Sequence, residues 1–130
     1  MKVFLSYAHH DEKPARELAQ WLKKQGLGVW SDEDFAPGDN LHEKIGKALS
    51  QADAMVVLIS PQSVESKFVQ SEIDFALTQP RFRNRLIPLV LRPTENIPWI
   101  LEKQQMVVVR PGKRAAAFRQ VADQLSAAAG

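Results

Sequence analysis

Short apolar runs alternate along the chain with longer segments whose apolar residues recur at helical spacing. The runs at residues 2–7, 27–30, 54–59, 85–91 and 106–109 are predicted to be strands. The third run, from Ala54 to Ile59, contains no polar residue, which is typical of a strand buried on both faces. Pro88 interrupts the fourth run and cannot donate a backbone hydrogen bond. That strand is therefore predicted to lie towards an edge of the sheet or to contain a bulge.

Four segments between or after these strands have apolar residues three or four positions apart, as an amphipathic helix does. The first follows Asp11, which can cap a helix N-terminus, and stops at Gly26. The second begins with Asn40 and Glu43 at the spacing of a capping box, and the third follows Ser66. The apolar positions are Ala15, Leu18, Ala19 and Leu22; Leu41, Ile45, Ala48, Leu49 and Ala52; Val69, Ile73, Ala76 and Leu77; and Phe118, Val121, Ala122 and Leu125.

This alternation of strands and helices predicts right-handed crossovers and a parallel sheet with helices on both faces. The 130 residues suit one domain, spanning 1–130, with the flavodoxin-like strand order 2-1-3-4-5. In that order the topological switch lies between the first and third strands, and ligands bind outside their carboxyl ends. These ends are Ser6, Tyr7 and Ala8 on the first strand and Ser60 on the third.

Further segments are predicted to border this crevice. Trp30 ends the second strand, and an acidic loop begins at Asp32. Glu72 lies four residues after Phe68 on the third helix, beside the apolar stripe and not opposite it. A carboxylate there would lie at the lip of the crevice, although periodicity alone favours a solvated glutamate. Tyr7 and Trp30 are equally compatible with aromatic residues at the edge of the core.

Composition argues against several classes of protein. The formal net charge of +2 is too balanced to indicate a nucleic-acid surface, and no apolar stretch is long enough to span a membrane. The lack of cysteine excludes disulfides, thiolate metal sites and thiol nucleophiles, and it fits a cytoplasmic location. Arg81, Arg83 and Arg85, with Arg92 further on, flank a predicted loop without the aromatic residues that stack on bases. We interpret these arginines as solvated.

The motifs of several enzyme and cofactor classes are missing from the predicted crevice. The turn after the first strand contains no glycine, which excludes a Rossmann dinucleotide site and a P-loop. A phosphorelay receiver would need an aspartate where Ser60 follows the third strand. His9, His10 and His42 do not predict a metal site, because adjacent histidines in a loop seldom bind one ion and no third ligand lies at a sensible spacing.

The remaining groups are hydroxyls, aromatic rings and the carboxylate of Glu72. Ser6 and Ser60 have no evident histidine–acid partner, so hydrolysis by a serine nucleophile is not expected. A fixed carboxylate is complementary to a developing oxocarbenium ion, and hydroxyls can hold a sugar. A glycosidic bond to a positively charged leaving group needs no general acid, and nicotinamide in NAD is such a group.

Four segments, in this order and at these separations, resemble bacterial TIR (Toll/interleukin receptor) domains over essentially the whole chain. They are Val3-Phe4-Leu5-Ser6-Tyr7-Ala8; Val29-Trp30-Ser31-Asp32 with Pro37-Gly38-Asp39; Leu58-Ile59-Ser60-Pro61; and Ser66-Lys67-Phe68 through Glu72. The resemblance implies a flavodoxin-like fold and an NAD glycohydrolase or cyclase of the kind that acts in antiphage defence. It also implies that Glu72 is catalytic and that Tyr7 and Phe68 line the nicotinamide pocket. Phe68 departs from the tryptophan that the family more often has there.

The resemblance further implies that copies of the chain assemble. The segment from Asp32 to Asp39 resembles the BB loop, which mediates TIR–TIR packing and helps to complete a neighbour's active site. Its predicted interface residues are Asp34, Phe35, Pro37 and Gly38. NAD is then a substrate, with no cofactor, and a separate effector protein is an expected partner, whereas nucleic acid and membranes are not. The alternative is a non-catalytic TIR–TIR interaction module that acts as an adaptor or interferes with host signalling.

Overall fold

The computed structural model describes residues 1–31 and 41–129. Within them, five parallel strands form one sheet in the order β2-β1-β3-β4-β5. The strands are β1 (Lys2–Ser6), β2 (Gly28–Trp30), β3 (Ala54–Ile59), β4 (Leu86–Val90) and β5 (Val107–Val108). The predicted flavodoxin-like fold and strand order are confirmed. β3 lies at the centre of the sheet with every residue buried, as its uninterrupted apolar sequence predicts.

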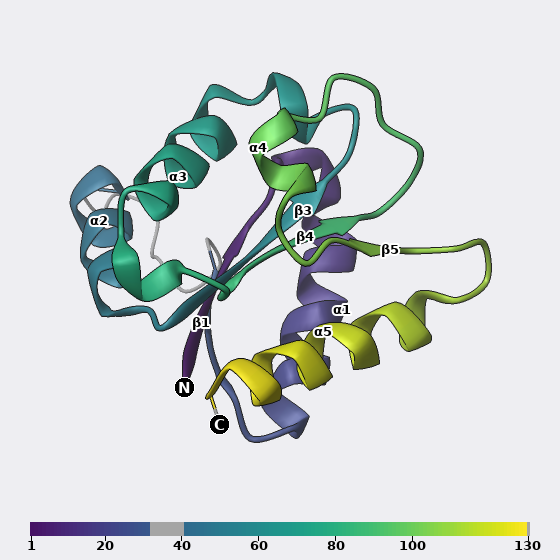
Figure 1. The fold of residues 1–130 in the computed structure, drawn as a ribbon, viewed down its shortest axis with the longest axis horizontal. Helices are drawn as coiled ribbons and strands as arrows, with labels where there is room; N and C mark the ends of the chain where they lie inside the picture. The colour runs from purple at the N-terminus through teal and green to yellow at the C-terminus, as the bar shows by residue number, and fades with distance from the viewer. Residues whose placement is uncertain (32–40, 130) are drawn as a thin grey trace.

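Helices cover both faces of the sheet, so that the molecule has three layers (Figure 1). One face carries α1 (Glu12–Lys24) and α5 (Arg114–Ala129). The other carries α2 (Leu41–Gln51), α3 (Lys67–Leu77) and the single turn α4 (Trp99–Glu102). In the part of the chain that the structure describes, no helix has both the length and the apolar character needed to cross a membrane.

Alternation along the strands divides the core into two apolar clusters. Val3 and Leu5 of β1 pack in the cluster beneath α1 and α5. Phe4 points the other way and packs in the cluster beneath α2 and α3. Successive strand side chains point to opposite faces, so Ser6 falls on the same face as Phe4. The sheet therefore presents the Ser6 hydroxyl to α2 and α3.

The helix cores follow the predicted pattern with two local differences. The buried residues of α1 are the predicted ones, and α3 is capped by Ser66, whose hydroxyl accepts a hydrogen bond from the Val69 N–H. Leu77 is 40% exposed at the last turn of α3, outside the predicted core. Asp11 directly precedes α1 but makes no side-chain capping hydrogen bond within the described residues. Its carboxylate has other partners, described below.

Pro88 lies without a bulge in β4, which is second from the edge of the sheet, so the strand lies towards an edge as predicted, although it is not the edge strand itself. The ladder between β3 and β4 continues through Pro88, which is the register partner of Val57. The Leu91 N–H donates to β3, and the Val90 carbonyl accepts from the Val109 N–H on the other side. Pro88 lies two residues before Val90, so its backbone faces the same neighbouring strand. The missing N–H of Pro88 therefore faces β5. In the described part of the chain β5 pairs with β4 only from Leu89 onward, so this ladder contains no bond that Pro88 would have to donate.

Candidate functional site

The carboxylate of Glu72 is buried beside the carboxyl end of β1. The Ser6 hydroxyl donates a hydrogen bond of 2.6 Å to Glu72 Oε1, and the glutamate is only 3% exposed. A solvated glutamate, which the periodicity alone favours, is therefore wrong. Ser6 is the last residue of β1, so the pair lies at the carboxyl pole of the sheet, where the topological switch predicts a ligand site.

The position of Glu72 follows from the helical repeat of α3. Val69, Ile73 and Ala76 are the buried apolar residues of this helix, and Glu72 is the remaining buried residue. Together these residues occupy positions i, i+3, i+4 and i+7, which is the spacing of a core-facing stripe. Glu72 therefore belongs to the stripe and does not lie beside it. An acidic residue in a core-facing position of a helix is the sequence feature that identifies this site.

The aromatic candidates fall on opposite faces of the sheet. Phe68 and Trp30 are half-buried and pack against the cluster beneath α2 and α3, and Lys2 Nζ lies 4.5 Å from the Trp30 ring centroid. Tyr7 is buried in the cluster beneath α1 and α5. It follows Ser6 and so points to the other face. The structure brings Glu72 and Phe68 together on one helix but does not group Tyr7 with Phe68 and Trp30. Ala8 is also buried, and its carbonyl accepts from the Asp11 N–H.

Ser60 belongs to a buried polar cluster that the sequence alone did not reveal. Its hydroxyl donates to Asp11 Oδ2, and Arg92 Nη2 donates to Asp11 Oδ1 at 3.1 Å and to Gln62 Oε1. Asp11 is only 1% exposed and Ser60 is fully buried. The Ser60 hydroxyl is thus engaged within the protein. Asp11 follows β1 and Arg92 follows β4, the two strands that flank β3, and Ser60 directly follows β3. Their positions just after parallel strands are the feature that could have placed them at the same pole.

Part of the predicted site falls within residues 32–40. Asp32 and the predicted interface residues Asp34, Phe35, Pro37 and Gly38 lie outside the described residues. Among the residues that are described, no three His, Asp or Glu side chains are grouped so as to hold a metal ion.

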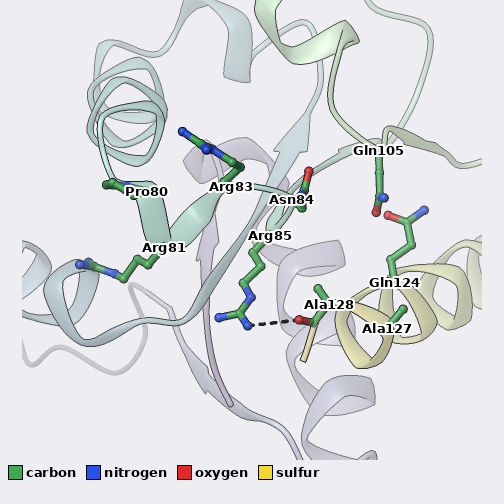
Figure 2. Close-up of a pocket in the computed structure, with 9 residues that line it drawn as sticks. All are labelled: Pro80, Arg81, Arg83, Asn84, Arg85, Gln105, Gln124, Ala127 and Ala128. Carbon is green, nitrogen blue, oxygen red and sulfur yellow. Dashed lines mark hydrogen bonds between the residues drawn. The ribbon is translucent and has the colours of Figure 1, made fainter. Parts of the chain in front are cut away.

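The clustered arginines lie at the opposite, amino-terminal pole of the sheet, around a cavity of about 610 Å³ (Figure 2). Their guanidinium groups point in different directions. Arg81 Nε donates to the Ala52 carbonyl at 3.0 Å, and its Nη2 donates to the Leu49 carbonyl, both at the end of α2. Arg85 Nη2 donates to the Ala128 carbonyl of α5 at 3.1 Å. The interpretation of these two arginines as solvated is therefore wrong, and it is also wrong for Arg92, which pairs with the buried Asp11, whereas Arg83 is exposed.

We expect Arg81→Gln to lower the free energy of unfolding by about 1–3 kcal/mol, because the carbonyls of Ala52 and Leu49 lose a charged donor. The same change at exposed Arg83 should cost less than about 0.5 kcal/mol. Urea unfolding of the two variants measures both values. Equal costs would show that the arginine contacts with α2 contribute nothing specific to stability.

Comparison with known proteins gives one family and several relatives. Residues 3–125 match the family model described as "TIR domain". The chain is 38% identical over 74 residues to an NAD(+) hydrolase, TcpA, of Theionarchaea archaeon, and 37% identical over 73 residues to a 2' cyclic ADP-D-ribose synthase, BtTIR, of Bacteroides thetaiotaomicron. Each match covers 55% of this chain but only 22% and 25%, respectively, of the relative's length.

The fold has a close counterpart among solved structures. The TIR domain of the Toll-related receptor TRR-2 from Hydra magnipapillata superposes with a TM-score of 0.72, covering 92% of this chain and 96% of that one. At 23% identity this likeness concerns the fold alone.

Proposed function

The chain belongs to the TIR-domain family, and we propose that it cleaves the bond between nicotinamide and ribose in NAD, as a hydrolase or a cyclase. The observation that carries the proposal is the buried Glu72 carboxylate, held by Ser6 at the carboxyl pole of the sheet. The names of two relatives, an NAD(+) hydrolase and a 2' cyclic ADP-D-ribose synthase, support the same substrate.

The chemistry proposed for Glu72 is electrostatic. When the glycosidic bond breaks, its electron pair leaves with the ring nitrogen, so nicotinamide departs neutral and the ribosyl group becomes a cation. A carboxylate in a site of low dielectric stabilises that cation more strongly than the neutral ribose ring of the ground state. Water then captures the cation and releases a proton to solvent, which gives ADP-ribose. Alternatively, a nitrogen, or a hydroxyl oxygen that releases its proton to solvent, captures the cation within the same molecule and gives a cyclic isomer. Neither outcome requires a general acid for the leaving group.

Ser6 and Phe68 have supporting roles in this proposal. The hydrogen bond from Ser6 fixes the direction of the Glu72 carboxylate and stabilises its charged form. Phe68 lies one helical turn before Glu72 and is half-buried. An aromatic face at that position suits stacking against the flat nicotinamide ring.

The proposal is tested by incubating the purified chain with NAD at several protein concentrations. Chromatography measures released nicotinamide, and mass spectrometry separates ADP-ribose from a cyclic product. A rate per chain that rises with protein concentration would support dependence of the activity on assembly of several copies. Absence of nicotinamide release at every concentration, in a chain that nevertheless self-associates, would contradict the enzyme and favour the adaptor role.

We expect Ser6→Ala to lower kcat on the order of tenfold with little change in KM, because the Glu72 carboxylate loses the donor that orients it. Ser50→Ala is the matched control, since the Ser50 hydroxyl is exposed and bonds only the nearby Lys47 carbonyl in the described structure. Steady-state kinetics with NAD measures kcat and KM for both variants. A wild-type kcat in Ser6→Ala would remove Ser6 from the proposed site.

A further inference from the structure

A second buried carboxylate, Asp11, lies near the proposed active site and has no role in the chemistry. It is 1% exposed, and its two oxygens accept hydrogen bonds from different parts of the chain. Oδ2 accepts from the Ser60 hydroxyl at the end of β3, and Oδ1 accepts from Arg92, two residues after β4. The Asp11 N–H donates to the Ala8 carbonyl just after β1. Asp11 therefore ties together the carboxyl ends of three neighbouring strands.

Ser60 extends this cluster toward the helix that bears Glu72. The Ser60 hydroxyl also accepts from the Ser63 N–H at 3.1 Å, and the Ser60 N–H donates to Ser63 Oγ at 2.8 Å. Ser63 begins the 3₁₀ turn η3 (Ser63–Glu65), whose first carbonyl accepts from the Ser66 N–H. Ser66 in turn caps α3 through the Val69 N–H. A continuous chain of hydrogen bonds thus leads from Asp11 to the first turn of α3.

Arg92 supplies the charge that such a buried carboxylate requires. A buried carboxylate without a partner is strongly unfavourable, and Arg92 forms the ion pair at 3.1 Å. The same Nη2 atom also donates to Gln62, within the connection between β3 and α3. Arg92 therefore acts on this connection both directly and through Asp11.

We propose that Asp11 and Arg92 are positioning residues for Glu72. They hold the connection from Ser60 to Ser66 and so fix where α3 begins. Ser6 separately orients the Glu72 side chain by donating a hydrogen bond to its carboxylate. The consequence for catalysis rests on the proposed cleavage of NAD. The consequence for α3 does not depend on any reaction.

The test compares Arg92→Gln and Arg92→Lys with Arg114→Gln. Arg114 forms an ion pair of 2.7 Å with Glu17 on the surface of the α1 and α5 face, so its loss is a matched control. We expect Arg92→Gln to lower kcat about tenfold with KM unchanged within about twofold. Arg92→Lys keeps the charge and should recover part of kcat. Arg114→Gln should behave as the wild type.

Hydrogen exchange gives a second measurement that needs no substrate. We expect faster exchange in Arg92→Gln for residues 62–72, with unchanged exchange in β1 and α5. If Arg92 only stabilises the fold, Arg92→Gln should accelerate exchange across the whole core, with no difference between residues 62–72 and the rest. Lower kcat would then reflect lower stability, and that result overturns the proposal. Asp11→Asn should reproduce the local pattern if it folds, and Arg92→Gln decides the question if it does not.

The two proposals fail in different ways. If the wild type releases no nicotinamide, the proposed function fails, and the exchange pattern alone still supports or refutes the positioning role. If the wild type cleaves NAD but Arg92→Gln retains both kcat and the exchange of residues 62–72, the positioning role is overturned and the function stands.

Discussion

Glu72→Gln is expected to abolish most NAD cleavage while the fold persists. Glutamine has nearly the same shape, and its amide oxygen can still accept the hydrogen bond that Ser6 donates. The negative charge is lost, and with it the stabilisation of the ribosyl cation. Removing a preorganised electrostatic contact of this kind lowers kcat on the order of 10²–10³-fold. Nicotinamide release, measured at equal concentrations of wild type and variant, gives the ratio.

The stability of the same variant distinguishes a functional carboxylate from a structural one. A charge buried at 3% exposure carries a desolvation cost, so neutralising Glu72 should leave the free energy of unfolding unchanged or raise it. Asp74→Asn, an equivalent change at an exposed position of the same helix, should alter neither activity nor stability. Equal nicotinamide release from Glu72→Gln and the wild type would exclude the proposed role of the charge.

The fold could be predicted from the sequence because its elements are set by local periodicity. The uninterrupted apolar run at β3 and the spacing of Ala15, Leu18, Ala19 and Leu22 on α1 are sufficient to predict a central strand and a covering helix. The alternation of such elements then restricts the topology to a doubly wound sheet. The sequence predicts only that the strand with Pro88 lies towards an edge. Which neighbouring strand the missing N–H faces depends on the pairing of β4 with the short β5, which local periodicity does not contain.

The site could be predicted only in part, because its contacts join residues far apart in the chain. Glu72 is recognisable as an acidic residue within an apolar stripe, but its partner Ser6 lies 66 residues away. The pairing of Asp11 with Arg92 spans 81 residues and depends on the orientations of two side chains. Tyr7 is the opposite case, because it is close to a site residue in sequence but lies on the other face of the sheet. It is adjacent to Ser6 at a strand end, yet alternation directs it to the other face of the sheet.

Phe4→Ala is expected to cause the largest loss of stability among the changes considered. The Phe4 side chain is fully buried on the central part of the sheet, where its register partners are Met55 of β3 and Trp30 of β2. Truncating a buried phenylalanine removes apolar contacts and leaves a cavity, at a cost of about 3–5 kcal/mol. That is a large share of the roughly 5–15 kcal/mol that stabilises a typical domain. Urea unfolding at constant m-value measures the loss.

Phe75→Ala is the matched control, because Phe75 lies on α3 beside the same apolar cluster but is only half-buried. We expect it to cost less than half as much, since the cavity would open to solvent and water could fill it. Phe4 and Ser6 share a face of β1, so Phe4→Ala also loosens the packing beneath α2 and α3. Phe4 itself is not part of the proposed site, so kcat of Phe4→Ala should stay near the wild-type value at low temperature. It should fall steeply as the temperature approaches the lowered unfolding midpoint, because the variant then unfolds. A cost for Phe4→Ala no greater than that for Phe75→Ala would contradict the assignment of Phe4 to the fully buried core.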